Sequence, residues 1–494
     1  MKNILLVTLT AILVIPLLVA CAPAAPVSTG TLSTTVEPSA SVSQTPVLPV
    51  MQSTTVKPSA TASQTATVPP GTPSATIKPS VSASQTPTVL PGTIKPVDLK
   101  SEKTRLTAPV VSSSDNASLM EGNRDFALNL YQEIKGTDGN LFFSPYSISE
   151  ALAMSYGGAR SETEKQMAAA LKFKLPQAQL HPAFNSLDQD LATRGQGAKG
   201  KDGQGFRLNV ANAIWGQQGF NFTPAYLDLL AQNYGAGMRI VDFKSSAEPS
   251  RLVINQWVSD QTEGKIKEVL PQGSVDDMTR LVLTNAVYFN AAWLSRFNKE
   301  ATASDVFHPL TGNDISLPMM KNKARFKYLE NDSLQAVELP YSGHKLSMVI
   351  LLPGADKFKF FESALTGPGL SSLIQQMQDD SVKLTMPKFS FSSQIELKEA
   401  LSQLGMPEAF TDKADFSGMD GQKDLLIEDV VHQAFVEVDE DGTEAAAATG
   451  ISLGATSIEL NFKEMKVDRP FIFIIRDIPT NSIIFIGRVT NPAN

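Results

Sequence analysis

Few residues of this chain could carry out chemistry on their own. The 494 residues include a single cysteine, Cys21, which excludes an internal disulfide and a cysteine metal site. The four histidines are scattered along the sequence: His181, His308, His344 and His432. No HExxH zinc motif and no Walker phosphate loop is present. A hydrolase built on Ser144 and His432 would lack a nucleophile elbow and an acidic partner motif. We therefore expect no catalytic centre, no metal and no cofactor.

Cys21 points to lipid chemistry instead. The chain begins with the short basic segment 1–3, followed by the mostly apolar residues 4–20, which is the pattern of a signal peptide. The sequence Leu-Val-Ala-Cys at 18–21 is similar to a bacterial lipobox, whose cysteine is lipidated. We expect a signal peptide over 1–20 and a membrane anchor at Cys21 on the extracellular face of the cell envelope. A plain secretory signal that ends in cysteine is the alternative.

A long segment without aromatic residues follows the cysteine. Residues 22–110 contain no Phe, Trp or Tyr and are rich in Ser, Thr, Pro, Ala and Val. A repeated unit begins at Thr34, Thr54 and Ala75, so its period is 20 and then 21 residues. Such a sequence cannot bury enough apolar surface to offset its ordering entropy. We predict a lipid-anchored disordered stalk over 21–110, with a partner-binding or glycosylated repeat as alternatives.

The remaining residues, 111–494, are expected to form one folded domain. The chain carries a net charge of −8 and no basic block, which argues against a nucleic-acid partner. Helical spacing predominates early in this part and strand-like alternation later, so the predicted class is α+β with large mixed or antiparallel sheets. One predicted helix begins with Ser147 as its N-cap and Glu150 three residues on. The predicted helices are 123–134, 147–155, 162–171 and 254–263. The predicted strands are 207–215, 280–289, 346–352, 383–391 with a break at Pro387, 430–438, 471–475 and 483–489.

Residues 439–457 fit no single element. Four alanines after Glu444 favour a helix, but glycines at 442, 450 and 454 leave too short a run for a stable one. Read with a period of two, the stretch has one face that becomes apolar and one that stays small or polar, as in a half-buried strand. Loop, helix and strand therefore all remain open. The face expected to point inward consists of Thr443, Ala445, Ala447, Thr449, Ile451 and Leu453.

Several short motifs, in order, resemble the serpin family from about residue 116 to 494. They include Asn140–Ile148, Leu283–Phe289, Trp293, Met386–Phe389, Leu404–Met406, Ala414–Ser417, Val431–Ala434, Glu440–Ala448, Asp468–Phe471 and Ile486–Pro492. The resemblance implies a single serpin-like fold of multi-domain size. It also implies three β-sheets, roughly eight or nine helices and an exposed reactive loop.

The resemblance further implies that the protein is not an enzyme but a suicide-substrate inhibitor of serine endopeptidases, and of some cysteine proteases. A protease attacks the loop, and the cut loop enters the central sheet as a new strand before the acyl-enzyme is hydrolysed. We expect a monomer whose partner is the target protease. A non-inhibitory serpin-fold surface binding protein is the alternative. The implied hinge residues are Glu440, Gly442, Thr443, Glu444, Ala445, Ala446, Ala447 and Ala448.

The family's usual loop length, counted from Gly442, places the reactive bond between Thr456 and Ser457, to within one or two residues. A small residue on the carbonyl side suits elastase-like or subtilisin-like proteases. Cleavage after Leu453 would indicate chymotrypsin-like enzymes instead.

The resemblance also implies a buried polar latch beneath the strands that part. Its members are Ser144, Ser147, Asn285 and His432, with Trp293 at the top of the sheet where the loop enters. The alternative is that these are hydrogen-bonded buried polar groups and a core tryptophan without a special role.

Overall fold

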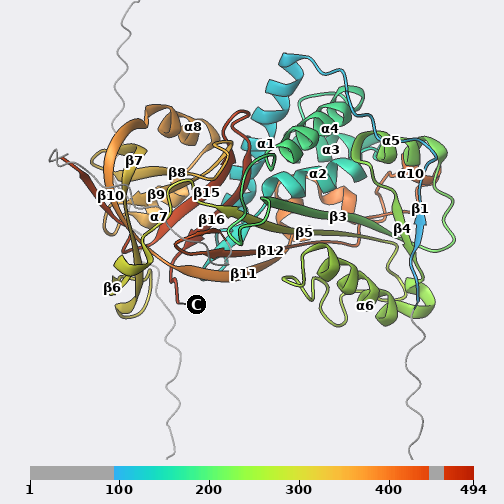
Figure 1. Cartoon of the computed structure of the whole chain (residues 1–494). Helices are drawn as coiled ribbons and strands as arrows, with labels where there is room; N and C mark the ends of the chain where they lie inside the picture. The colour runs from blue at the N-terminus through green and yellow to red at the C-terminus, as the bar shows by residue number, and fades with distance from the viewer. Residues whose placement is uncertain (1–93, 444–460, 494) are drawn as a thin grey trace, which may run out of the picture. The chain divides into compact units, whose positions relative to one another are not determined.

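The computed structural model describes residues 94–443 and 461–493, coloured in Figure 1. Within these residues the chain forms ten α-helices, two short 3-10 helices and sixteen strands. The α-helices are α1 (Ser113–Ile134), α2 (Pro145–Tyr156), α3 (Ser161–Ala170), α4 (Gln177–Thr193), α5 (Pro224–Tyr234), α6 (Phe243–Gln261), α7 (Phe358–Ala364), α8 (Gly367–Gln376), α9 (Lys398–Gln403) and α10 (Ser417–Asp420). The 3-10 helices are η1 (Lys299–Ala301) and η2 (Pro407–Phe410). No helix among the described residues is long and apolar enough to span a bilayer.

A seven-stranded sheet carries the region predicted to be functional. Its strands, in spatial order, are β1 (Val97–Leu99), β4 (Met238–Val241), β3 (Arg207–Gln217), β5 (Leu281–Ala292), β13 (Gly442–Thr443), β12 (Asp429–Val438) and β11 (Phe389–Glu396). The central strand β5 is buried along its whole length. It pairs in parallel with β12 from Val282 opposite Asp429 to Val287 opposite Ala434. Beyond this point the two-residue strand β13 lies between them.

The other nine strands form a second hydrogen-bonded network. Its spatial order is β14 (Lys463–Lys466), β10 (Gln378–Pro387), β7 (Ile315–Glu330), β8 (Leu334–Pro340), β9 (Leu346–Pro353), β15 (Phe471–Asp477), β16 (Ile483–Val489) and β2 (Leu141–Phe143), while β6 (Ala303–Phe307) pairs with β7. The α+β class is confirmed. The expected three sheets merge into two networks in the described residues, because β7 pairs with β10 along most of its length and continues into its pairing with β8.

Helices cover both faces of the seven-stranded sheet. In Figure 1, α6 lies on one face, and α2 lies on the opposite face among α1 to α5. The α6 side is sealed by a small core that includes Trp215, Phe243, Ile254 and Val431. On the α2 side the sheet packs against the main core, and all twelve residues of α2 are buried. Polar groups of α2 that face the sheet therefore have no access to water and need partners within the protein.

Most of the predicted elements are present with shifted ends. The predicted hairpin of the last two strands is the antiparallel pair β15 and β16, and the break at Pro387 separates β10 from β11. The predicted N-cap at Ser147 is wrong. Ser144 caps α2, because its Oγ accepts the Ser147 N–H at 3.2 Å, and Pro145 occupies the first helical position, where its missing N–H costs nothing.

The fold also reaches further towards the N-terminus than expected. Strand β1 pairs antiparallel with β4, and the approach is so close that a Cβ on Gly237 would lie 2.5 Å from the Leu99 carbonyl oxygen. Further on, the backbone N–H of Leu106 donates to the carbonyl of Gln232 at 2.9 Å. Residues 97–106 thus belong to the fold, and our boundary between stalk and domain at residue 110 lies too far along the chain.

Candidate functional site

The predicted hinge is partly inserted in the sheet. After β12 the chain turns back, and Gly442 and Thr443 form β13 opposite Ala292 and Ala291 of β5. Thr443 also pairs with Val438 of β12, and its Oγ1 lies 2.8 Å from the Tyr341 hydroxyl. Thr443 faces the core with 1% of its surface exposed. We had expected the whole reactive stretch to lie outside the sheet, so the position of these two residues corrects that expectation.

Charges from several segments hold the acidic turn between β12 and β13. The Glu440 carboxylate accepts from Lys388 Nζ at 2.6 Å and from Thr302 Oγ1 at 2.7 Å. Burial alone would raise the pKa of Glu440, but these two hydrogen bonds, a backbone hydrogen bond and the charge of Lys388 together lower it. Asp441 pairs with Lys299 Nζ at 2.5 Å and lies 3.5 Å from Arg296 Nη1. The turn is therefore held by ion pairs and hydrogen bonds to several separate segments.

Lys201 holds the same turn from the opposite side. Its side chain is fully buried, with Nζ 2.8 Å from Asp439 Oδ2 and 3.7 Å from Glu437 Oε1. Burial lowers the pKa of Lys201, and the hydrogen bond and charge of Asp439 act against that shift. The backbone N–H of Lys201 donates to Asn290 Oδ1 at 2.8 Å. The loop between α4 and β3 is thereby attached both to β5 and to the turn.

Trp293 closes the top of this arrangement. Its indole N–H donates to the Asp439 carbonyl at 2.9 Å, and its backbone N–H donates to the Asp441 carbonyl at 2.9 Å. Its ring stacks on Tyr341, with centroids 4.6 Å apart and an interplanar angle of 9°. Tyr341 in turn contacts Thr443, so the aromatic pair lies directly against the inserted hinge.

The four residues predicted as a latch lie together where β5 and β12 pair. Asn285 of β5 is directly opposite His432 of β12, and Asn285 Oδ1 accepts from His432 Nδ1. The same oxygen accepts from Ser147 Oγ at 2.9 Å. The Ser144 backbone N–H donates to His432 Nε2 at 3.1 Å. All four residues are fully buried, and any strand entering between β5 and β12 must break the bond between His432 and Asn285.

These bonds determine the protonation of His432. Nε2 accepts a backbone N–H, so the proton must be on Nδ1, and the ring is neutral. Burial lowers the pKa of His432 to about 3, against a smaller raising effect of Asn285. His432 therefore acts as an oriented donor to Asn285. With both nitrogens engaged, it is unsuited to be a hydrolase base for Ser144.

Some predicted site residues lie outside the described residues. They are Cys21, Glu444, Ala445, Ala446, Ala447, Ala448, Thr456 and Ser457. The reactive bond, the lipid anchor and most of the hinge thus stay predictions. Within residues 94–443 and 461–493, no three His, Cys, Asp or Glu side chains are grouped so as to hold a metal ion.

Two glycine patterns resemble enzyme motifs by spacing alone. Gly195, Gly197 and Gly200 fit GxGxxG, but they follow helix α4 and precede strand β3, whereas a dinucleotide site needs a strand before the glycines and a helix after them. This loop carries Lys201 to the hinge instead. Residues 450–454 fit GxSxG and lie outside the described residues. The first pattern therefore does not supply a dinucleotide site.

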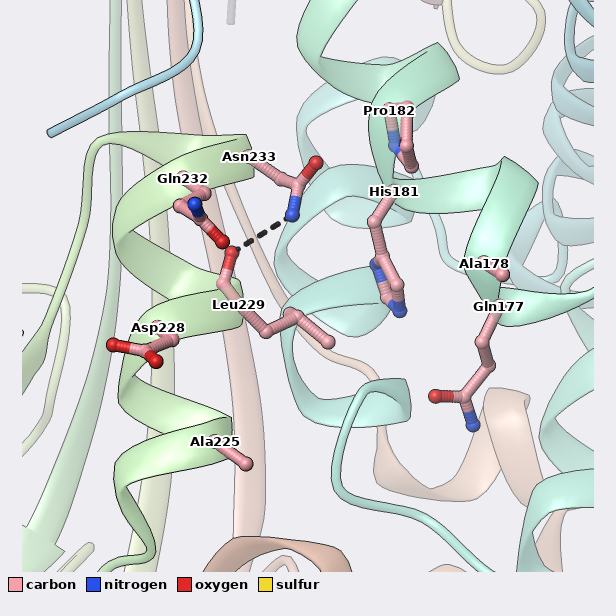
Figure 2. A pocket seen from close by; sticks show the side chains of 9 residues that line it. All are labelled: Gln177, Ala178, His181, Pro182, Ala225, Asp228, Leu229, Gln232 and Asn233. Carbon is pink, nitrogen blue, oxygen red and sulfur yellow. Dashed lines mark hydrogen bonds between the residues drawn. The ribbon is translucent and has the colours of Figure 1, made fainter. Parts of the chain in front are cut away.

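A separate pocket of about 370 Å³ lies between α4 and α5 (Figure 2). Its lining includes Gln177, His181, Asp228 and Asn233. His181 Nδ1 lies 2.7 Å from the Tyr234 hydroxyl, and burial lowers the pKa of His181 to about 4. Neither helix contributes a residue to the hinge or the latch, so the pocket is not part of that site.

The residues of the site that sequence reasoning missed include Lys201, Tyr341 and Asn212. Asn212 of β3 lies opposite Asn285, and its Oδ1 accepts from Asn285 Nδ2. Asn212 lies within the predicted strand 207–215, and a polar residue in such a strand could have indicated a buried hydrogen-bond partner. Lys201 and Tyr341 lie far from the hinge in sequence, and no local pattern connects them to it.

Comparison with known proteins agrees with this geometry. The family model described as serpin (serine protease inhibitor) matches residues 121–492. An uncharacterized serpin-like protein of Thermococcus kodakarensis is 39% identical over 385 residues, covering 78% of this chain and 88% of that protein. The leukocyte elastase inhibitor of Bos taurus is 39% identical over 388 residues, covering 76% and 99%. The crystal structure of tengpin, a thermophilic serpin in the native state, has a TM-score of 0.71 at 29% identity and covers 81% of this chain and 100% of that one.

The conformation of Gly442 gives a first prediction. Its φ is +156°, and a Cβ there would lie 2.1 Å from the Ala291 carbonyl oxygen and 2.8 Å from the Ala292 Cα. Gly442→Ala should therefore drive β13 out of the sheet and lower the free energy of unfolding by about 1–3 kcal/mol in urea titration. Gly136→Ala is the control, because a Cβ there meets nothing within 4 Å. Equal stability of the two variants would contradict the assigned hinge geometry.

The neutral state of His432 gives a second prediction. The pKa of His432 in the folded chain is lowered to about 3. Below pH 6.5, His432 is therefore protonated in the unfolded chain but stays neutral in the native chain. The stability that neutral His432 contributes is therefore fully present above pH 6.5. As the pH falls from 6.5 towards 3, the free energy of unfolding drops by up to about 1.4 kcal/mol per pH unit. His181 contributes with the same sign, since its pKa is also lowered. Urea titrations between pH 7 and 4 should show a smaller slope for His432→Gln.

The control for this slope is His308→Gln, because His308 is exposed and pairs with Asp314 on the surface. This variant leaves every hydrogen bond of the latch in place and serves as the reference for the slope. Glutamine at 432 can still donate to Asn285 and accept from Ser144, so the native fold is retained. An unchanged slope in His432→Gln would show that His432 is not held neutral by the latch.

Proposed function

Because the chain belongs to the serpin family, we propose that it inhibits serine endopeptidases as a suicide substrate. The bovine relative at 39% identity is named for inhibiting leukocyte elastase, which supports an inhibitor over an enzyme. The proposal rests mainly on β13, because a strand that has begun to enter between β5 and β12 marks the path of further insertion. Insertion of a loop into a sheet is an established kind of protein switch.

The register of β13 fixes where the rest of the loop would go. Thr443 lies opposite Ala291 of β5 and Val438 of β12, and β13 is antiparallel to both. Each further residue of the loop would therefore step back by one along both strands. Six steps on, Thr449 would lie between Asn285 and His432. A threonine hydroxyl both donates and accepts, so it could replace the bond that insertion breaks.

The composition of the hinge suits rapid entry. The residues that follow Thr443 are small as far as Ala448, apart from Glu444, which would face the opposite side from Thr443 once in a strand. No proline occurs from 442 to 469, so no backbone donor is missing along the inserted strand. Residues 443–456 would span about 45 Å when extended. The new backbone hydrogen bonds, at about 1 kcal/mol each, would contribute on the order of 10 kcal/mol.

Trapping depends on whether the loop inserts faster than water hydrolyses the acyl-enzyme. A protease that attacks the Thr456 carbonyl becomes acylated and releases the amine of Ser457. If the loop enters the sheet before water reaches the acyl-enzyme, the protease is carried along and distorted. Thr456 is small, so elastase-like and subtilisin-like enzymes with shallow pockets are the proposed targets. Cysteine proteases, which also form acyl-enzymes, are a further target class.

We further propose that the inhibitor acts at the outer surface of the cell envelope. The support is the signal-like segment before Cys21 and the aromatic-free repeats that follow it. Acyl chains on Cys21 would anchor the protein, with each buried methylene contributing about 0.8 kcal/mol. The Ser/Thr/Pro-rich segment would hold the inhibitor domain away from the membrane.

The insertion mechanism predicts the effect of charge at the first inserted residue. Thr443→Arg places a long cation where the side chain is 1% exposed and 2.8 Å from the Tyr341 hydroxyl. The variant should be cut as a substrate, whereas the unaltered chain and Thr443→Ser should form SDS-resistant complexes with elastase or subtilisin. Mass spectrometry of the released C-terminal peptide should find Ser457 at its start. Full inhibition by Thr443→Arg would contradict insertion, and nicking without complex by all three proteins would favour a non-inhibitory surface binding protein.

The anchor makes a separate prediction. Cys21→Ser removes the only thiol that can be lipidated, so the protein should move from the membrane fraction to the soluble fraction of the expressing cells. Fractionation followed by immunodetection measures this change. Membrane partition equal to that of the unaltered chain would exclude Cys21 as the anchor.

A further inference from the structure

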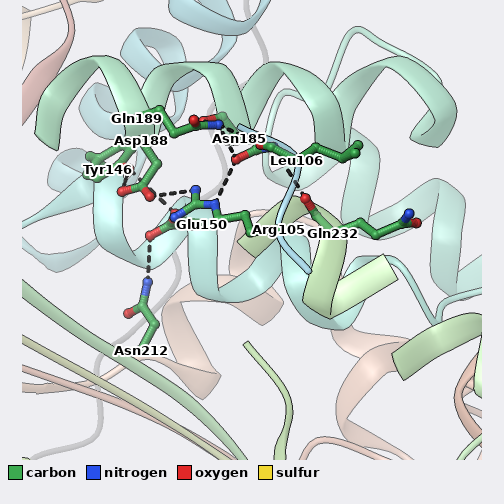
Figure 3. Close-up of polar contacts among 9 residues, drawn as sticks. All are labelled: Arg105, Leu106, Tyr146, Glu150, Asn185, Asp188, Gln189, Asn212 and Gln232. Atoms are coloured by element: carbon green, nitrogen blue, oxygen red, sulfur yellow. Dashed lines mark hydrogen bonds and ion pairs between the residues drawn. The ribbon is translucent and has the colours of Figure 1, made fainter. Parts of the chain in front are cut away.

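The polar contacts of the latch continue across the sheet and away from the opening between β5 and β12 (Figure 3). Asn212 of β3, which accepts from Asn285, donates from its Nδ2 to Glu150 Oε2 at 2.9 Å. The same amide nitrogen lies 3.2 Å from the Ser147 carbonyl oxygen. Three adjacent strands thus carry His432, Asn285 and Asn212 in one row. The row ends on a buried carboxyl group of α2.

Glu150 connects this row to α4 and to the segment before α1. Its Oε1 lies 3.5 Å from the Tyr146 hydroxyl, which donates to Asp188 Oδ1 at 3.2 Å. Arg105 Nη2 pairs with Asp188 Oδ2 at 2.6 Å, and Arg105 Nε donates to Asn185 Oδ1 at 2.8 Å. A continuous set of contacts therefore joins Arg105 to His432. Arg105 lies in the part of the chain that we had assigned to the stalk.

The backbone beside Arg105 is itself fixed. The Leu106 carbonyl accepts from Asn185 Nδ2 at 2.8 Å and from Gln189 Nε2 at 2.9 Å, as Figure 3 shows. The Leu106 N–H donates to Gln232 of α5. Arg105 is therefore held in place by both α4 and α5, so the position of its guanidinium relative to Asp188 is well defined.

The contacts leave little freedom in the orientation of the two amides. Asn285 must present its oxygen to His432 and Ser147, so its nitrogen faces Asn212. Asn212 must then present its oxygen to Asn285, so its nitrogen faces Glu150. An acceptor at Glu150 fixes the whole direction of donation. Without that acceptor, only the Ser147 carbonyl would hold the Asn212 nitrogen, and a rotated Asn212 would leave Asn285 Nδ2 without its acceptor.

Glu150 supplies this acceptor in a site that disfavours a charge. Burial raises the pKa of Glu150 well above its ordinary value, and Asp188 raises it further, while Arg105 and the hydrogen bond from Asn212 act in the opposite direction. Tyr146 of the same helix also contacts the carboxyl group. Arg105 is thus the cation that offsets Asp188 beside Glu150.

We propose that Glu150 and Arg105 are positioning residues for loop insertion: through Asn212 and Asn285 they stabilise the closed pairing of β5 with β12. The segment 97–106 is then a working part of the latch rather than the end of a spacer. Only the link to loop insertion rests on the proposed function, because the closed pairing of β5 with β12 can be measured without a protease.

The test is hydrogen exchange of backbone amides in the intact chain. Arg105→Met removes the charge and keeps the length, and Glu150→Leu removes the acceptor. Each should lower the exchange protection of residues 282–287 and 429–434 roughly five-fold, the effect of one lost hydrogen bond. The β15–β16 pair is the internal reference and should keep its protection, since the effect is local opening rather than global unfolding.

Two matched variants distinguish a positioning role of Arg105 and Glu150 from a general stabilising effect of the segment 97–106. Lys103→Met removes another ion pair of the same segment, 2.8 Å from Asp228 on α5, that has no contact with the row. Glu150→Gln keeps a neutral acceptor of the same shape. Both should retain the protection of the unaltered chain at 282–287 and 429–434. The proposal is overturned if Lys103→Met opens the pair as Arg105→Met does, if Glu150→Gln behaves as Glu150→Leu, or if protection falls equally in β15–β16.

A double-mutant cycle tests the coupling itself. Arg105→Met combined with His432→Leu, which removes both hydrogen bonds of the imidazole ring, should lower protection by less than the product of the single effects, because both act on one row of contacts. Independent effects that multiply would contradict the coupling. Failure of the inhibitor proposal is recognised separately, since it would leave these exchange results intact and yield only nicked chain with elastase and subtilisin.

Discussion

The pairing of β5 with β12 is the constraint on which the rest of the structure depends. Under the proposed mechanism these strands stay closed in the waiting protein and part when the loop enters. Their contact is closed at its centre by a buried bond between His432 and Asn285, which is oriented by Ser144 and Ser147. A polar contact suits this task, because an incoming polar group can replace it, whereas apolar side chains packed across the opening would offer no such exchange.

The upper end of the same pair is already open. Strand β13 occupies it, and the acidic turn that leads to β13 is held by cations from separate segments, including Lys201 and Lys388. Glu440 and Asp441 of this turn are buried, so their cations are needed to compensate for lost hydration. The hinge is therefore a fixed starting point, and the proposed insertion extends an existing strand rather than nucleating a new one. Arg105 and Glu150 would determine how strongly the closed pairing of β5 with β12, near Asn285 and His432, resists further insertion.

The sequence predicted those parts of the site that depend on local pattern. The strand character of 430–438 is visible in neighbouring residues and is confirmed as β12, and the N-cap at Ser144 could have been read from Pro145. The alternation of small residues after Gly442 stays a prediction. The latch residues came from family resemblance alone. Strand β1 has only three residues, and its partner β4 lies far along the chain. Likewise Lys201 and Arg105 reach their partners through tertiary packing, which no local periodicity encodes.

The crystal structure of the chain cut in its reactive loop tests the account most directly. The account predicts that residues 443–453 lie as a strand between β5 and β12 in the register that β13 begins. In that register the Thr449 hydroxyl lies within hydrogen-bond distance of Asn285 or His432. A cut chain in which β5 and β12 remain paired, with His432 still bonded to Asn285 and the loop outside the sheet, would contradict it.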